Sequence, residues 1–166
     1  SITLPQDVSD FDNACQVLLA LSETVGARLR EAKVRCNSVT VELKDWKFAC
    51  QSHQCVLKSP TDSTSVLYDT ACQLLKEFWD KTPVRLIGLR TTQIQEETFE
   101  QISLFEDEHA KKMRAMEKAV DAIRGRYGID SVQRASFLKE STLTPHAVSR
   151  QKHLGKASEQ TPGKEF

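Results

Sequence analysis

Three side chains between residues 50 and 55 have the types and spacing to bind a metal ion or to react as thiols. Cys50, His53 and Cys55 would supply zinc with three of the sulfur and nitrogen ligands that it prefers. The spacing matches no common zinc knuckle, and no fourth ligand lies nearby in the sequence. We therefore favour thiols packed in an alternating strand over a zinc centre or a thiol enzyme, and we expect no metal site here.

The cysteine count and the hydropathy pattern indicate in which cellular compartment the protein lies. Five cysteines are an odd number without a framework spacing, which favours reduced thiols over a disulfide-stapled secreted module. No apolar run approaches the roughly 18 to 20 residues that a membrane span needs. We therefore expect a cytoplasmic protein with no membrane partner. The chain opens directly on SITLP, which we interpret as the start of a piece of a longer protein.

A second candidate site is the apolar pair Leu104 and Phe105, which lies in a stretch whose charged residues are all acidic. Residues 93–109 carry six acids and no Lys or Arg, residues 1–92 carry 11 of each sign, and residues 110–166 carry 12 basic and 6 acidic side chains. The charge pattern predicts a neutral body, an acidic connector and a basic tail. The pair either covers the core of the body or is exposed in order to bind a partner.

The elements that must position these residues follow from periodicity. Apolar positions three and four apart predict a helix over 10–33, with Asp10 as its N-cap, and a second helix over 63–80. Alternation predicts strands, and the predicted strands are 1–5, 38–44, 47–57 and 82–91. The order is β-α-β-β-α-β, an α+β fold in which two helices cover one face of a mixed four-stranded sheet. The other face is expected to be open.

Beyond the body we expect a different organisation. Residues 93–109 have no regular spacing of apolar side chains, which predicts a flexible linker. Residues 108–127 predict a third helix that ends at Gly128, within a helical tail over 110–138, and residues 139–166 are expected to be disordered. The apolar stripe of this helix comprises Met113, Met116, Val120, Ile123 and Tyr127. The stripe favours a core face. It could fold back on the body, pair with residues 136–138, or bind a partner.

Several separated segments, in the right order, resemble one protein family. They are SITLPQDVSD, LLALSETVGARLR, VTVELK, Phe48, PTDST with the apolar positions that follow it, and VRLIGLR. Over about residues 1–92 they resemble the C-terminal little-finger domain of Y-family translesion DNA polymerases, of the bacterial DinB (DNA polymerase IV) type in the ImpB/MucB/SamB family. KAVDAIRGRYGIDSVQRASFL is similar to the tail of Gram-positive members. The pattern leaves open whether the DinB or the UmuC-like and MucB-like branch is nearer.

The resemblance implies a function in lesion bypass. Family members extend a primer past damaged template bases with a palm domain whose carboxylates hold Mg²⁺. Nothing in this chain resembles that palm, so we expect the fragment itself to be catalytically inert. The little finger of the family lies in the major groove and grips the duplex backbone without reading the sequence. An alternative is a stand-alone clamp-binding adaptor of the same fold that never joins a palm.

The resemblance also assigns candidate DNA contacts. On the middle strands the outward set is Thr40, Glu42 and Lys44, continued with less support by His53 and Cys55. Arg85 and Arg90 match basic positions that touch the DNA backbone in this family. The predicted DNA-binding residues are Thr40, Lys44, His53, Arg85 and Arg90. Where family members often place arginines this chain has His53 and Cys55, so we expect a weak grip that salt readily disrupts.

The last implied partner is the bacterial sliding clamp, the β subunit of the replicative polymerase. The predicted clamp-binding residues are Gln101, Ile102, Ser103, Leu104 and Phe105. Their form resembles the peptide that these polymerases carry after the little finger. A docking peptide of this kind needs a glutamine at the mouth of the pocket and two adjacent large apolar side chains to fill it. The competing interpretation is that the segment covers the core of the body itself.

Overall fold

The predicted order of helices and strands is confirmed. The computed structural model describes residues 1–96 and 108–138, and the docking segment 101–105 and the predicted disordered tail lie outside them. The elements are β1 (Ile2–Val8), α1 (Phe11–Glu31), β2 (Val34–Asp45), β3 (Cys50–Thr61), α2 (Thr64–Phe78), β4 (Val84–Glu96), α3 (Glu108–Tyr127), η1 (Ile129–Ser131) and η2 (Ala135–Leu138). Asp10 caps α1 as predicted, because the Asn13 N–H donates to its carboxylate at 3.0 Å.

The four strands form one sheet in the order β1-β4-β2-β3, and every neighbouring pair is antiparallel. The prediction of a mixed sheet is therefore wrong. The two strands joined by α1 do run in the same direction, but β4 lies between them and is antiparallel to both. Parallel neighbours consequently do not occur, although the chain contains a β-α-β connection.

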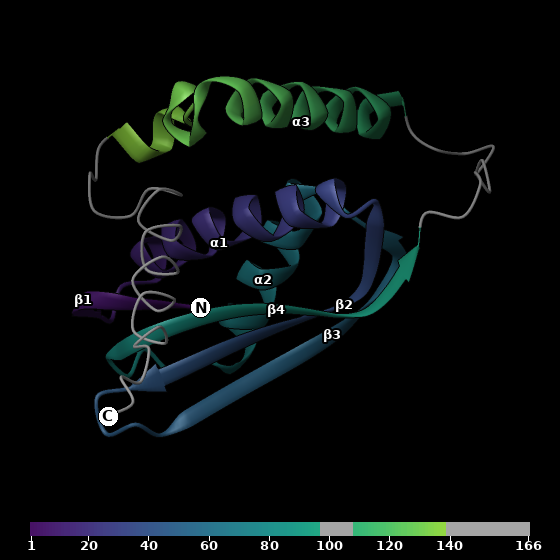
Figure 1. The fold of residues 1–166 in the computed structure, drawn as a ribbon. Coiled ribbons are helices and arrows are strands. Elements are labelled where there is room, and N and C mark those ends of the chain that lie inside the picture. The colour runs from purple at the N-terminus through teal and green to yellow at the C-terminus, as the bar shows by residue number, and fades with distance from the viewer. Residues whose placement is uncertain (97–107, 139–166) are drawn as a thin grey trace, which may run out of the picture.

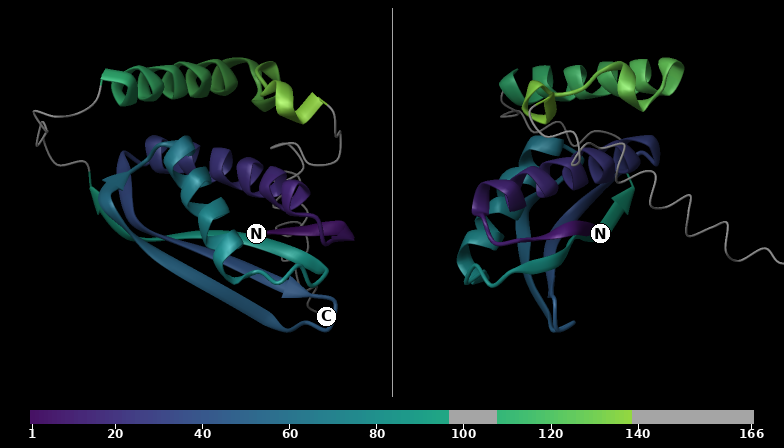
Figure 2. Two further views of the ribbon diagram at one scale, coloured as in Figure 1. Left: turned by 180° about the vertical axis from the view of Figure 1, so that it is seen from behind. Right: turned by 90° about the vertical axis from the view of Figure 1, so that its left-hand side faces the viewer.

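The two faces of the sheet differ because β2 alternates. Val39, Val41 and Leu43 are buried on one side, whereas the residues between them are only partly covered. α1 and α2 pack on the apolar side, with Leu18 of α1 and Leu67 of α2 fully buried there (Figure 1, Figure 2). Burial of this apolar face explains why both helices lie on the same side of the sheet.

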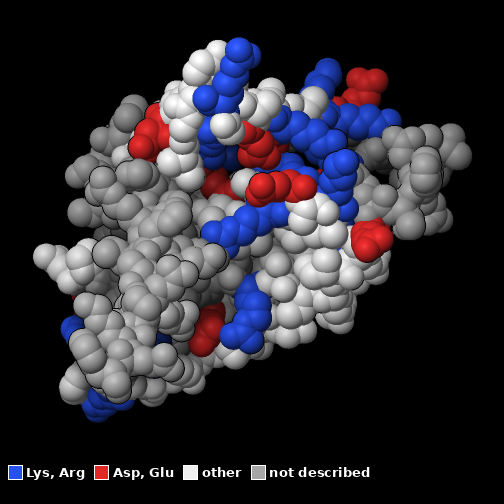
Figure 3. Space-filling model, in the orientation of Figure 1, with Lys and Arg blue, Asp and Glu red and all other residues white. Residues whose placement is uncertain are grey.

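α3 forms a third layer over the outer side of α1 (Figure 1, Figure 2). The prediction that its apolar stripe is a core face is wrong, since Met116, Ile123 and Tyr127 are 46%, 40% and 68% exposed. The helix does fold back on the body, but its buried residue is Glu117, only 4% exposed. Figure 3 shows acidic and basic side chains crowded together between α3 and α1. A charged contact therefore replaces the expected apolar one.

Glu117 of α3 completes the N-terminus of α2. Its Oε1 accepts a hydrogen bond from the Thr64 N–H at 2.9 Å, and its Oε2 lies 3.1 Å from Arg30 Nη1. The residue at the N-cap of α2, Ser63, makes no side-chain capping bond of its own. A carboxylate from a distant helix thus satisfies a terminal N–H and meets the positive end of the helix dipole.

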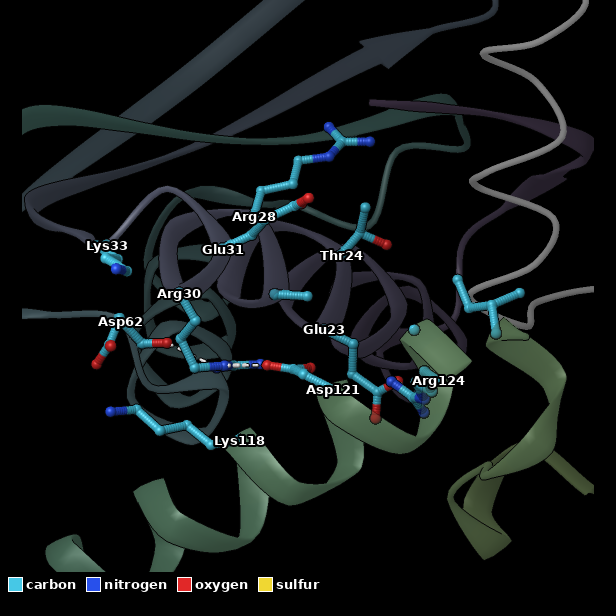
Figure 4. Close-up of a pocket in the computed structure, with 13 residues that line it drawn as sticks. Glu23, Thr24, Arg28, Arg30, Glu31, Lys33, Asp62, Lys118, Asp121 and Arg124 are labelled. Atoms are coloured by element: carbon cyan, nitrogen blue, oxygen red, sulfur yellow. Dashed lines mark hydrogen bonds and ion pairs between the residues drawn. The ribbon is translucent and has the colours of Figure 1, made fainter. Parts of the chain in front are cut away.

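Arg30 is the centre of this contact. Its guanidinium forms a two-pronged ion pair with Asp121 of α3 and donates to the Asp62 backbone carbonyl at 2.8 Å (Figure 4). Gly26, one turn earlier in α1, leaves room for this arrangement, because a Cβ there would lie 2.8 Å from Thr64 Oγ1. Arg114 of α3 adds an ion pair to the Asp62 carboxylate at 2.9 Å.

The end of the described chain is fastened in the same way. Glu23 of α1, which is 5% exposed, forms ion pairs with both Arg124 and Arg134. Gly128 follows α3 with a φ of 97°, as predicted for a C′ residue, and allows the chain to turn back. Phe137 in η2 is 2% exposed and joins the hydrophobic core. We call residues 108–138 the strap, because ion pairs fix its middle and an aromatic ring fixes its end.

Replacing Glu117 tests whether the strap stabilises the body. Glu117→Ala leaves the Arg30 charge and the Thr64 N–H without this partner, so the free energy of unfolding should fall by about 3 kcal/mol. Urea denaturation followed by circular dichroism measures it. Glu108→Ala, at the exposed start of α3, is the matched control and should cost less than about 1 kcal/mol. Equal losses for the two variants would mean that the contacts of Glu117 with Arg30 and Thr64 do not hold the strap on the body.

Candidate nucleic-acid interface

The side of the sheet away from the helices carries the candidate site, which we call the open face. Its middle rows are set by the register of β2 with its two neighbours. Thr40 lies between Arg90 and Gln54, Glu42 between Gly88 and Ser52, and Lys44 between Leu86 and Cys50. The structure thus brings together three of the predicted residues, Thr40, Lys44 and Arg90, on one surface. Hydroxyl, amide and cationic groups of this kind contact phosphate without reading bases.

Arg90 is the most available cation of this surface. Its side chain is 66% exposed, and Nη2 lies 3.2 Å from Glu42 Oε2 across the β2–β4 pair. Exposed ion pairs contribute little to stability, so exchanging Glu42 for a phosphate would cost little. Beside this ion pair, Gly88 leaves room for the Glu42 side chain, because a Cβ at Gly88 would lie 3.3 Å from Glu42 Cβ. Gly88 is not among the predicted site residues, although an isolated glycine in a strand signals close approach of another group.

Arg85 has a different environment from Arg90. Its Nε lies 2.8 Å from Asp7 Oδ1 in the neighbouring edge strand β1, and a second contact of 3.4 Å joins Nη2 to Oδ2. Hydrogen bonding to the Asp7 carboxylate raises the pKa of the Arg85 guanidinium above its usual value. A phosphate at Arg85 would have to compete with Asp7, so DNA contact by Arg85 stays a prediction.

The placement of His53 on the open face is wrong. The register pairs His53 with Val41, whose side chain points into the core, and pairs Cys55 with Val39. The His53 ring stacks on Phe78 of α2 at 5.7 Å between ring centroids. His53 therefore faces the helices, and Gln54 and Ser52 take the places on β3 that the sequence analysis gave to His53 and Cys55.

The same register argues against a zinc site formed by Cys50, His53 and Cys55. Cys50 pairs with Lys44 and so lies on the open face, while His53 and Cys55 point to the other side of the strand. Three ligands divided between two faces of a sheet cannot converge on one ion. Across residues 1–96 and 108–138, no group of three or more His, Cys, Asp and Glu side chains could hold a metal ion.

A cavity of about 690 Å³ lies between α1 and α3. Figure 4 shows charged side chains of both helices around it, with Arg30, Asp62, Asp121, Glu23 and Arg124 taking part in the ion pairs of the strap. The cavity indicates that polar contacts, rather than continuous apolar packing, hold α3 on α1. Because α3 lies on the side of α1 away from the sheet (Figure 1), the cavity between these two helices is separate from the open face.

The predicted clamp-binding residues occupy the segment between β4 and α3. β4 ends at Glu96, five residues beyond the predicted strand, and α3 begins at Glu108. Residues 101–105 lie between these ends and outside the described residues. None of the helices that the structure describes is long and apolar enough to cross a membrane.

Comparison with known proteins gives a consistent result. The chain is 30% identical over 138 residues to DNA polymerase IV of Clostridium acetobutylicum, covering 83% of this chain and 35% of that protein. It is 35% identical over 159 residues to DNA polymerase IV 2 of Bacillus subtilis, covering 93% of this chain and 37% of that protein. The chain thus spans about a third of the length of these relatives, and the matched part includes the strap.

Two further comparisons concern the domain itself. A solved structure described as an insertion ternary complex of Dbh DNA polymerase matches 57% of this chain and 27% of its own at 21% identity, with a TM-score of 0.48. The match is too distant to locate any contact of this chain. The model of the impB/mucB/samB family C-terminal domain matches residues 1–104. The chain therefore belongs to the impB/mucB/samB family, and these residues are the little finger of a Y-family polymerase of the DNA polymerase IV type.

Proposed function

We propose that this chain is the part of a lesion-bypass DNA polymerase that grips primer-template duplex and docks on the sliding clamp. The observation that carries the proposal is the open face. α1, α2 and the strap all lie on the other side of the sheet, so none of the described elements covers it (Figure 1, Figure 2). An uncovered sheet surface with hydroxyl, amide and cationic groups suits the backbone of a duplex.

The composition of the open face supports a weak and sequence-independent grip. Lys44 and Arg90 are its cations in the central rows, and Glu42 lies between them in the register. Each neutralised phosphate releases counterions and contributes roughly 0.9 to the log-log salt dependence of the affinity. Two cations and a carboxylate therefore correspond to a slope near 2 and to an affinity that falls quickly with salt.

Docking on the clamp by Gln101, Leu104 and Phe105 would supplement this grip. Burying the two apolar side chains would contribute about 1.5 to 3 kcal/mol each, from which the cost of ordering the segment is subtracted. A clamp encircles the duplex that the open face holds, so the second association becomes intramolecular, at an effective concentration on the order of millimolar. Two weak contacts together would then keep the polymerase at the primer end.

The chemistry of nucleotide transfer belongs elsewhere in such a polymerase. The relatives named DNA polymerase IV are about three times as long as the matched part, which corresponds to their C-terminal domain. We assign the Mg²⁺ ions and the carboxylates that hold them to a palm domain of the parent protein. The present chain would bind and position the duplex, in the cytoplasm, and would transfer no nucleotide itself.

Arg90→Ala tests the duplex grip. The variant should bind a fluorescein-labelled primer-template duplex more weakly whatever its sequence, and its log-log salt slope should be smaller by about 1. Fluorescence anisotropy over a salt series measures both quantities. Arg126→Ala, at the exposed end of α3, removes the same charge from the other side of the molecule and should leave the slope unchanged. Equal slopes for the two variants, or strong binding confined to one sequence, would refute the grip.

A double substitution, Gln101→Ala with Phe105→Ala, tests the docking segment. Binding to the bacterial sliding clamp, measured by surface plasmon resonance, should fall below detection, because the pocket loses its hydrogen bond and one apolar side chain. The melting temperature should stay the same. A lowered melting temperature with intact clamp binding would instead mean that the segment covers the core of the body.

A further inference from the structure

The turn that joins β2 to β3 exposes two aromatic rings. Trp46 is 54% exposed and Phe48 is 71% exposed, whereas Trp79 is 9% and Phe137 2% exposed. We call residues 45–49 the aromatic tip. Large aromatic rings normally contribute to a core. Both belong to the connection between β2 and β3, which lies at an end of the sheet away from the helices (Figure 1). Their exposure needs a reason other than folding.

The aromatic tip has a defined backbone. The Asp45 N–H donates to the Ala49 carbonyl at 3.1 Å, the Ala49 N–H donates to Asp45 Oδ1 at 2.8 Å, and the Phe48 N–H donates to the Asp45 carbonyl at 3.2 Å. These bonds, two from the Asp45 backbone and one to its carboxylate, close a short turn on a single residue. The backbone that carries the two rings is therefore held by the turn.

Phe48 adopts an unfavourable backbone conformation in this turn. Its φ is 67°, in the left-handed region where glycine or asparagine is the usual residue. A large side chain there costs free energy, and the exposed ring regains little of it by packing. Such outliers collect at binding sites, where the backbone is held in a shape that the ligand requires. Glycine would satisfy the turn better, so the ring itself is the informative feature.

Each ring also has a lysine ammonium group next to it. Lys44 Nζ lies 5.3 Å from the centroid of Phe48, and Lys47 Nζ lies 4.9 Å from that of Trp46. An apolar protein pocket that took up the rings would have to remove water from both ammonium groups, which is costly. A nucleotide has no such conflict, because its base stacks on the ring while its phosphate pairs with the lysine.

We propose that the aromatic tip binds single-stranded template, with unpaired bases stacked on Trp46 and Phe48 and phosphates paired with Lys44 and Lys47. The inference rests on the proposed duplex grip and extends it. Lys44 belongs to both surfaces, since it lies in the last row of the open face and against the Phe48 ring. A duplex held on the open face could therefore continue as a single strand over the aromatic tip.

Phe48→Gly in the full chain separates a binding role from a folding role. Glycine relieves the backbone strain, so the melting temperature should stay the same or rise. Affinity for a duplex with a single-stranded template overhang should fall by roughly fivefold or more, as expected for losing one stacked base. Affinity for the blunt duplex of the same sequence should not change. Phe48→Tyr keeps a ring at this position and should restore overhang binding.

Trp46 provides an independent spectroscopic measurement. The chain has two tryptophans, and the other one, Trp79, is buried. The overhang duplex, but not the blunt one, should quench the fluorescence component that is present in the wild type and absent from Trp46→Phe. That result would place bases against the ring.

The outcomes distinguish this inference from the proposed function. If Phe48→Gly binds both duplexes as the wild type does, and Trp46 is not quenched, the single-strand site is refuted and a protein surface becomes the better candidate for the rings. The duplex grip would still stand if Arg90→Ala weakened blunt-duplex binding in the same experiment. If the wild type binds neither duplex, both proposals fail together.

Discussion

The one-sided apolar pattern of β2 is the constraint on which the architecture depends. Val39, Val41 and Leu43 point to one side of the sheet, so both body helices must lie there to bury them. The strap packs on the outer side of α1 and leaves the opposite face of the sheet uncovered by the described elements. The opposite face keeps its polar rows, and its availability for a ligand follows from the way the core is built rather than from a separate device.

Charged groups, not apolar ones, join the third layer to the second. Glu23, Asp62 and Glu117 are each at most 5% exposed, and arginines from the facing layer pair with all three. Burying such charges is costly unless every one of them is paired, so their net contribution to stability is small. Their contribution to specificity is larger, because a shifted strap would leave unpaired charges in a dry environment. The ion pairs fix one position of α3, and within the strap it is Phe137 of η2, not α3, that joins the hydrophobic core.

Local sequence patterns predicted the helices and strands. The features that were not predicted depend on contacts between residues far apart in the sequence. Apolar spacing located both helices and the strand over 38–44, and the short connections, Pro83 and the element order located the other strands of residues 1–96. The face of His53 depended on the hairpin register, which alternation within β3 alone does not reveal, and a slip of one residue reverses it. The contact of α3 depended on Arg30 and Glu117, which are 87 positions apart. Apolar periodicity gives no indication that a helix packs through charged side chains. On the open face, the isolated Gly88 in a predicted strand was the sequence feature that indicated close packing and was not used.

The strap also fixes the two points between which the predicted clamp-binding residues lie in the sequence. β4 and α3 belong to one packed body, so residues 97–107 are fastened at both ends. Eleven residues separate these two ends in the sequence, which amounts to at most about 40 Å of contour at roughly 3.5 Å per residue. A tail fastened at one end would sweep a larger volume. A partner bound between two such fixed points would have to stay close beside the domain.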